Sequence, residues 1–375
     1  MNNSGSPPIA LALSGGGVRA MVFHLGVLQF LAERQLLERV SRISTVSGGS
    51  LLVGLMLQEN MLRWPSSKTF SSVVLPNLRT RLCASSMQWG AMRQLRHPRN
   101  WQFLFARANL LALALENEWG VTGKLSDLNA IPEWSVNGTT AETGKRFRFK
   151  AASLGDYSLG YASTGDFPLS SALAVSAAFP GGFGPFKFDA HLFQWERRPW
   201  GTPAGQEYPV DIGYQHLHLY DGGVYDNLGL EPFFDSGRGK SKLADECIVV
   251  SDAGAPLVNG FSMGALNPFR LKRVADIMSD QSRALRVRTF AHYIQQAHAR
   301  GAYLYINTPV SDTTVCNSAE FAASFPTTLR RLKDYEFDRL FEHGHRVACQ
   351  VEDQYGIVGE PSGAEEKIND NARDI

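Results

Sequence analysis

The sequence predicts an α/β protein built around a mostly parallel sheet with helices on both faces. Two observations lead to this fold class. Residues 9–13 (IALAL) form a short apolar run without alternation, which is typical of a strand buried on both faces. The order strand, glycine-rich turn, apolar helix then occurs twice between residues 9 and 57, and strands joined through helices run parallel.

The first of these units carries a glycine turn. Gly15, Gly16 and Gly17 follow the strand, and they predict a sharp turn that leaves backbone N–H groups bare. Residues 18–33 predict a mostly buried helix because few of them are strongly polar. N–H groups at the start of a helix can hold a negative oxygen, so the turn is a candidate anion or oxyanion site.

The second unit carries a candidate nucleophile. Residues 42–46 predict a strand, Ser47 with Gly48 and Gly49 predicts a tight turn, and residues 51–57 predict another apolar helix. A serine on such a strand-to-helix turn points outward as a nucleophile, and glycines beside it leave room for an incoming carbonyl. Both turns are expected at the same edge of the sheet.

A nucleotide-binding fold is the rival interpretation of the glycine turn. Gly15, Gly17 and Ala20 fit the spacing of a dinucleotide-binding fingerprint. That fold needs an acidic residue at the end of the second strand to hold the ribose. The second predicted strand ends at Val46 and Ser47 without a carboxylate, which disfavours a nucleotide-binding oxidoreductase.

The middle of the chain supplies further elements and a strongly basic window. Residues 135–139 and 146–153 predict strands, and the small-residue segment 168–180 predicts a helix packed against the one that follows Ser47. Residues 60–115 contain no Asp or Glu, and they carry eight basic residues among several aromatic ones: Arg63, Lys68, Arg79, Arg81, Arg93, Arg96, Arg99, Arg107, Trp64, Trp89, Trp101, Phe103 and Phe105. This window is either a lid or docking insertion for an anionic membrane, or packing with a solvated basic face.

Two aspartates stand at predicted strand ends. Residues 216–220 form a weakly alternating strand before Asp221, which Gly222 and Gly223 uncover. Residues 247–254 predict a buried strand that reaches Asp252. By chemistry alone either carboxylate is a candidate general base, and the glycine pair favours Asp221.

Four histidines follow Asp221 in the order that a serine–acid–histidine triad uses. They are His292, His298, His343 and His345. None lies in a glycine-flanked loop at a strand end: the first two are expected within a helix and the last two at the surface. A triad is therefore not excluded, but no local feature marks its histidine.

The C-terminal third is expected to be mainly helical. Asn267 and Pro268 predict the start of a helix whose apolar residues line one face and whose basic residues lie on the solvated face; the apolar set is Leu271, Val274, Ile277, Met278, Leu285 and Phe290. Residues 359–375 predict a disordered acidic tail. Without a repeat or a convincing linker, residues 1–358 are expected to form one domain.

The totals exclude several classes of protein. The net charge of +1 argues against a nucleic-acid binder, and four scattered cysteines suggest free thiols in a reducing compartment and no metal site. No cofactor is expected. With no secretory signal and no apolar stretch of transmembrane length, the expected location is cytoplasmic, with peripheral contact at the inner membrane face.

Three stretches together resemble the patatin-like phospholipase family. They are Gly15-Gly16-Gly17-Val18-Arg19, Thr45-Val46-Ser47-Gly48-Gly49, and Asp221-Gly222-Gly223 with the downstream Asp226-Asn227. The resemblance covers roughly residues 9–350. One position departs from the family pattern, since Thr45 stands where the usual elbow has glycine.

The resemblance implies a three-layer α/β/α sandwich, the patatin-like variant of the α/β-hydrolase architecture. It also implies a lipid acyl hydrolase that cleaves acyl esters of phospholipids with a dyad of Ser47 and Asp221. Gly15, Gly16, Gly17 and Arg19 would form the oxyanion hole, and Arg19 could also attract a headgroup phosphate. The alternative is a catalytically weak or inactive lipid-binding protein, for which Thr45 is the argument.

Overall fold

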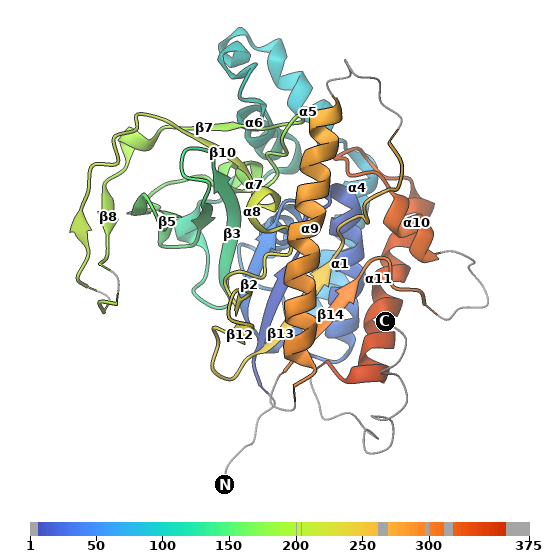
Figure 1. Cartoon of the computed structure of the whole chain (residues 1–375). Helices are drawn as coiled ribbons and strands as arrows, with labels where there is room; N and C mark the ends of the chain where they lie inside the picture. The colour runs from blue at the N-terminus through green and yellow to red at the C-terminus, as the bar shows by residue number, and fades with distance from the viewer. Residues whose placement is uncertain are drawn as a thin grey trace.

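The computed structural model describes residues 7–199, 201–203, 205–261, 269–296, 300–310 and 318–357. The expectations for Asn267, Pro268, His298 and the tail 359–375 lie outside these residues. Within them the chain forms a mixed α/β structure, in which a large sheet that is parallel at its centre is flanked by helices (Figure 1). This is the fold class that the sequence predicts.

In the described part of the chain, twelve strands form the large sheet and two more form a small hairpin. The strands of the large sheet are β1 (Ile9–Leu13), β2 (Val40–Val46), β3 (Glu133–Thr140), β4 (Arg146–Phe149), β5 (Ser153–Asp156), β6 (Gly160–Ser163), β7 (Phe186–Phe188), β8 (Trp195–Arg197), β9 (Tyr208–Pro209), β10 (Leu217–Asp221), β13 (Cys247–Asp252) and β14 (Gly301–Tyr305). The hairpin pairs β11 (Phe234–Asp235) with β12 (Lys240–Ser241).

The helices surround this sheet. The α-helices are α1 (Gly17–Glu33), α2 (Gly48–Glu59), α3 (Ser67–Thr69), α4 (Leu75–Ala84), α5 (Met87–Arg93), α6 (Arg107–Trp119), α7 (Leu169–Ser176), α8 (Gly223–Asp226), α9 (Phe269–Ile294), α10 (Ser318–Ser324) and α11 (Asp334–Tyr355). The short helices are η1 (Leu37–Arg39), η2 (Phe70–Val74), η3 (Gln94–Arg96), η4 (Pro98–Phe103), η5 (Leu125–Asp127) and η6 (Ala190–Leu192).

The central strands run parallel in the order β14-β13-β1-β2-β3. Beyond β3 the sheet continues antiparallel through β4, β5, β6, β8 and β9. All five residues of β1 are buried, as the unalternating apolar run predicts. The carboxyl ends of β1, β2 and β13 therefore lie side by side, and the loops that follow them share one edge of the sheet.

Each face of the sheet has its own apolar core. The larger core packs α1, α2, α6, α7 and α11 on one face, and the smaller one packs residues 228–234 and Phe290 of α9 on the other. Two glycines let α1 and α11 touch through their backbones: a Cβ on Gly26 or on Gly344 would lie 2.1 Å from a carbonyl oxygen of the facing helix. The predicted packing of α7 on α2 is also present, since a Cβ on Gly54 would lie 2.4 Å from Leu173 Cδ1.

The predicted orientation of α9, with its basic side in solvent, is wrong. Leu271, Met278 and Leu285 are 79%, 68% and 60% exposed, whereas Arg283 and Arg286 contact the buried carboxylates of Asp252 and Asp226. These two ion pairs therefore determine which side of α9 faces the sheet. Phe290, a member of the predicted apolar set, is buried. Among the described residues, no helix is both long and apolar enough to cross a membrane.

Candidate active site

Strand β3 brings Ser47 and Asp221 together. Along one of its edges, β2 pairs with residues 133–137 and β10 pairs with residues 138–140, while β4 occupies the opposite edge. Val46 and Asp221 are consequently partners of the consecutive residues Asn137 and Gly138. The last residue of β10 meets the residue that follows β2, although 174 positions separate them in the sequence.

Ser47 sits on a sharply bent backbone. Its φ of 50° and ψ of −116° lie in a region that residues with a side chain rarely adopt, and its N–H donates to the Ser176 hydroxyl at 2.9 Å. The following glycines serve the packing of the two turns. A Cβ on Gly48 would lie 2.3 Å from the Gly17 carbonyl oxygen, and one on Gly49 would lie 2.6 Å from that of Leu13.

Thr45, the departure from the usual elbow, belongs to a chain of buried hydroxyl groups. The Trp134 indole N–H donates to Thr45 Oγ1 at 2.9 Å, and this oxygen is 2.7 Å from Ser50 Oγ. Ser50 Oγ in turn is 2.8 Å from Ser176 Oγ, the atom that receives the Ser47 N–H. Thr45 is therefore accommodated by hydrogen bonds that extend to the backbone of the elbow.

The first glycine turn lies directly against the elbow. A Cβ on Gly15 would lie 3.0 Å from Ser47 Cβ, and Gly16 and Gly17 have φ of 147° and 63°, which favour glycine. Neighbouring donors are occupied, since Gly15 N–H binds the Asn227 carbonyl and Val18 N–H binds that of Thr328. Among the described residues, no hydrogen bond uses the N–H of Gly16 or of Gly17.

Arg19 supports this turn from inside α1. Its side chain is 2% exposed, and its guanidinium donates to the carbonyl oxygens of Ala253 at 3.1 Å and Phe325 at 2.5 Å. Burial lowers its pKa to about 10, partly offset by the nearby Asp252 carboxylate. This burial favours a positioning role for Arg19 over contact with a headgroup.

The Asp221 carboxylate has an unusual electrostatic environment. It is 4% exposed, and burial raises its pKa to about 7, although the Gly223 N–H at 2.7 Å and a hydrogen bond from the Ser47 side chain lower it. No arginine or lysine contributes to this shift. A buried carboxylate beside an elbow serine is the arrangement that a proton acceptor requires.

Comparison with known proteins decides the family. The family profile described as patatin-like phospholipase matches residues 11–234, which is more than half of the chain. The chain belongs to the patatin-like phospholipase family. No curated protein sequence matches it significantly.

The solved structure of human GIVD cytosolic phospholipase A2 resembles this patatin-like chain with a TM-score of 0.53 and 15% identity, over 94% of this chain and 59% of the human one. A complex of that human protein with methyl gamma-linolenyl fluorophosphonate and terbium chloride gives a TM-score of 0.50 and 14% identity, over 92% and 58%. The chain thus spans about three fifths of the human protein's length. At such identity the likeness shows the fold alone.

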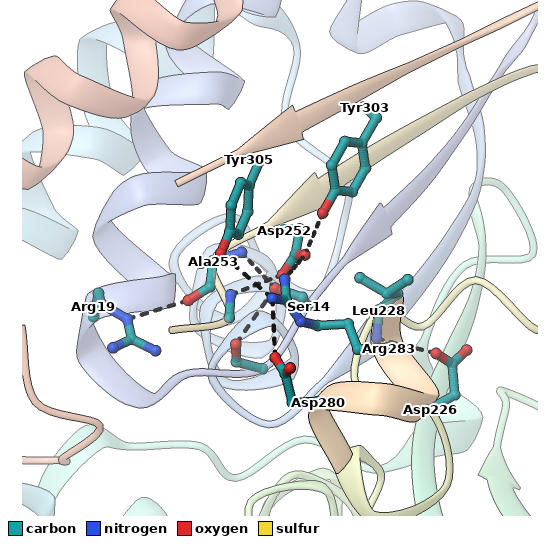
Figure 2. A network of polar contacts seen from close by, with 12 residues as sticks. Ser14, Arg19, Asp226, Leu228, Asp252, Ala253, Asp280, Arg283, Tyr303 and Tyr305 are labelled. Atoms are coloured by element: carbon teal, nitrogen blue, oxygen red, sulfur yellow. Dashed lines mark hydrogen bonds and ion pairs between the residues drawn. The ribbon is translucent and has the colours of Figure 1, made fainter. Parts of the chain in front are cut away.

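The competing aspartate is committed to other partners (Figure 2). Asp252 is fully buried; its Oδ1 accepts from the Gly254 N–H at 2.8 Å, and its Oδ2 accepts from Arg283 and from the Tyr303 hydroxyl, both at 2.6 Å. Figure 2 shows Arg283 reaching this carboxylate from α9 and Tyr303 from β14. Asp252 therefore holds three segments together, beyond the turn chemistry expected for it.

No described histidine is placed to complete a triad. His343 was expected at the surface, but it is 1% exposed, and its Nε2 contacts the Ile306 carbonyl at 2.6 Å. His345 pairs with Glu33, and His292 is exposed. Within the described residues no hydrogen bond joins a histidine to Ser47 or Asp221, and no group of three possible ligands could hold a metal ion.

Asn227 is a site residue that the sequence reasoning did not single out. Its carbonyl accepts from Gly15 N–H at 3.1 Å, and its Oδ1 lies 2.5 Å and 2.7 Å from where a Cβ would stand on Gly15 and Gly223. The amide thus fills the space between the turn before α1 and the turn after Asp221. Its place directly after Asp226 in the third family-like stretch was the signal available in the sequence.

Proposed function

We propose that this chain is a serine lipid acyl hydrolase that cleaves acyl esters of phospholipids by a dyad of Ser47 and Asp221. One observation carries the proposal: the elbow serine and the buried Asp221 carboxylate are placed next to each other by consecutive residues of β3, beside a glycine turn whose Gly16 and Gly17 N–H groups make no hydrogen bond among the described residues. Membership of the patatin-like phospholipase family supports lipid acyl esters as the substrate class.

The reaction proceeds in two steps. Asp221 accepts the Ser47 hydroxyl proton as Ser47 Oγ attacks the ester carbonyl, and the N–H groups of Gly16 and Gly17 bind the tetrahedral oxyanion. Asp221 then passes the proton to the leaving alcohol as the ester C–O bond breaks, and an acyl-enzyme on Ser47 remains. In the second step water hydrolyses this acyl-enzyme with Asp221 as base. Arg19 acts on this chemistry by fixing the turn, not by touching the substrate.

The electrostatics suit a reaction without histidine. A carboxylate with an ordinary pKa near 4 is a weak base, whereas burial raises the pKa of Asp221 to about 7 and makes it comparable to an imidazole. The Thr45 hydroxyl has hydrogen-bond partners within the elbow, which supports an intact elbow and favours the hydrolase over an inactive lipid-binding protein.

We further propose that residues 87–107, named here the docking segment, bring the enzyme to an anionic membrane. Trp89, Trp101 and Phe105 are 68%, 64% and 88% exposed there, and the segment projects at the top of the molecule in Figure 1. Arg96, Arg99 and Arg107 are exposed without an ion pair among the described residues. Elsewhere in the basic window Arg79 pairs with Asp338 and Arg81 with Glu59, so only part of that window fits docking.

The direct test is a lipid-product analysis. Phospholipid vesicles incubated with wild-type protein should release free fatty acid and lysophospholipid, and the Ser47→Ala protein should release neither, since loss of a nucleophile costs roughly 10⁶ in a well-studied serine enzyme. Circular dichroism on both proteins controls for folding. A Ser47→Ala protein that keeps a tenth of the rate would exclude Ser47 as the nucleophile.

A further inference from the structure

A small cavity lies on the sheet face opposite α2. Its volume is about 100 Å³, and it is lined by Arg42 of β2, by Glu133 and Ser135 of β3 and by basic residues of β4. The side chains of β3 alternate between the faces, and Trp134 on the other face reaches Thr45 and the elbow. The cavity and the candidate active site therefore occupy different places on the sheet.

The cavity has an excess of positive charge. Arg146, Arg148 and Lys150 are at alternate positions of β4 and its end, so their side chains leave the same face of the sheet. Lys150 and Arg42 both bind Glu133, and Arg42 also binds Glu246. Arg146 and Arg148 have no ion pair within the described residues, although the carboxylates of Glu231 and Asp226 lie near enough to Arg146 to raise its pKa.

The contacts of these two partly buried arginines are with neutral groups, not with carboxylates. Arg146 donates to the Asn137 side-chain oxygen at 3.1 Å, which is a neutral acceptor. Arg148 has its guanidinium 4.1 Å from the Tyr161 ring centroid, and its buried Nε has no hydrogen-bond partner. Burial and the charge of Arg148 both lower the pKa of Arg146, and the carboxylates of Glu231 and Asp226 offset only part of this.

We propose that this cavity binds the phosphate group of a small soluble anion. A phosphate offers the charge and the multiple acceptor oxygens that two neighbouring guanidinium groups bind best. The volume of the cavity is sufficient for a phosphate group, and Phe233 and Leu243 form an apolar part of its wall.

The position of the cavity favours a soluble phosphate over a lipid headgroup. Arg42 and Glu133 pair near the amino ends of β2 and β3, whereas Ser47 follows the carboxyl end of β2. Ser47 is five positions after Arg42, which corresponds to roughly 16 Å along the strand at 3.3 Å per residue. A membrane presented to Ser47 would lie at the other edge of the sheet.

Isothermal titration with inorganic phosphate tests the inference on the intact chain. Wild-type protein should give a saturable isotherm, and Arg148→Gln should weaken binding at least tenfold. Lys145→Gln is the matched control: it removes a positive charge from an exposed residue in the turn beside β4, outside the cavity lining, and should bind like wild type. Arg146→Gln provides a second test if Arg148→Gln fails to fold.

The outcomes separate the possible sources of phosphate. No saturable binding by wild-type protein, or equal binding by folded Arg148→Gln, would overturn the proposal. Vesicles that contain phosphatidic acid form the second arm. A third result is that wild-type protein binds these vesicles but not inorganic phosphate, with vesicle binding lost in Arg148→Gln. In that case the cavity would be a headgroup site and the soluble-anion proposal would fail. Neither arm depends on hydrolysis, so a failure of the proposed enzymatic function would be seen separately.

Discussion

At the scale of single residues, two aspartates at strand ends have opposite environments. Asp221 lies beside Ser47 and has no cationic partner among the described residues, whereas one oxygen of Asp252 accepts hydrogen bonds from Arg283 and from the Tyr303 hydroxyl. A proton acceptor needs access to the hydroxyl it deprotonates, and a carboxylate saturated by fixed donors lacks it. The environments, not the sequence positions, distinguish the proposed base from the aspartate that joins three segments.

This difference predicts opposite effects of one chemical change. Asp221→Asn should lower ester hydrolysis by orders of magnitude with vesicle binding unchanged. Asp252→Asn should mainly lower the free energy of unfolding, because it leaves Arg283 buried beside a neutral group. Steady-state hydrolysis of a short-chain ester and thermal unfolding measure the two quantities. Collapse of activity in a well-folded Asp252→Asn, with Asp221→Asn active, would reverse the assignment.

The raised pKa of Asp221 predicts a pH dependence. Activity requires the carboxylate, so kcat/KM should rise with pH and level off above an apparent pKa near 7. A pH–rate profile from pH 5 to 9 measures this rise of kcat/KM with pH. If the rise is absent from His343→Gln, a histidine is the base instead. Activity that stays constant down to pH 5 would contradict a base with this pKa.

The same pKa has a consequence for stability. Because burial raises it from an ordinary 3.8 to about 7, the folded state binds more protons than the unfolded state between these values. The free energy of unfolding therefore decreases as pH rises through this window. Asp221→Asn cannot ionise and should be more stable than wild type at pH 8, by an amount on the order of a few kcal/mol, with the gain absent at pH 3. Denaturant titrations at both pH values measure the difference, and a destabilised variant at pH 8 would contradict it.

At the scale of elements, the active-site turns are held by hydrogen bonds between strands and helices. The hydroxyl chain of Thr45, Ser50 and Ser176 joins β2, α2 and α7 at the point where Ser47 has a positive φ. Strain at such a position persists only where its surroundings fix it. Thr45 is thus part of the elbow's support in this chain.

Thr45→Val tests this support. The variant keeps the shape but leaves the Trp134 N–H and the Ser50 hydroxyl with fewer partners, which should cost about 1–3 kcal/mol of unfolding free energy. Thr45→Val should also lower kcat with KM unchanged. Thr45→Ser, which keeps the hydroxyl, should have the kcat and the free energy of unfolding of the wild type. A valine variant as active and as stable as wild type would show that the hydroxyl has no positioning role.

Much of this arrangement was predictable from the sequence, and the failures have physical reasons. The run 9–13, the glycine turns and Asp221 at a strand end were found because local chemistry marks them. Asn227 was missed because its contacts reach across three loops, and the buried place of His343 depends on the Ile306 carbonyl. The direction of α9 was wrong because periodicity does not record the buried carboxylates that Arg283 and Arg286 contact.

At the scale of the whole molecule, we propose that residues 1–358 act as one domain, because a single sheet carries both apolar cores. The docking segment then moves with the active site, and its exposed aromatic and basic residues suit the interface of an anionic bilayer. The apolar side of α9 is a separate exposed surface, to which no partner is assigned.

Docking predicts salt-dependent binding. Wild-type protein should co-sediment with anionic vesicles more than with neutral ones, and 0.5 M salt should weaken this as it shortens the Debye length from about 10 Å at 0.1 M. Arg96→Gln with Arg99→Gln should reduce binding by about 1 kcal/mol per charge. Trp101→Ala with Phe105→Ala should reduce it further, while Tyr355→Ala, an exposed aromatic at the end of α11, serves as the control. Equal binding to both lipids at every salt concentration would exclude this role.

A fluorophosphonate probe shows whether Ser47 is a nucleophile activated by Asp221. The probe reacts covalently with an activated serine, and mass spectrometry of the digested protein identifies the modified residue. We predict one adduct, on Ser47, absent from Ser47→Ala and formed orders of magnitude more slowly by Asp221→Asn. An adduct on another serine would show that Ser47 is not the nucleophile, and equal labelling of wild type and Asp221→Asn would show that Asp221 does not activate it.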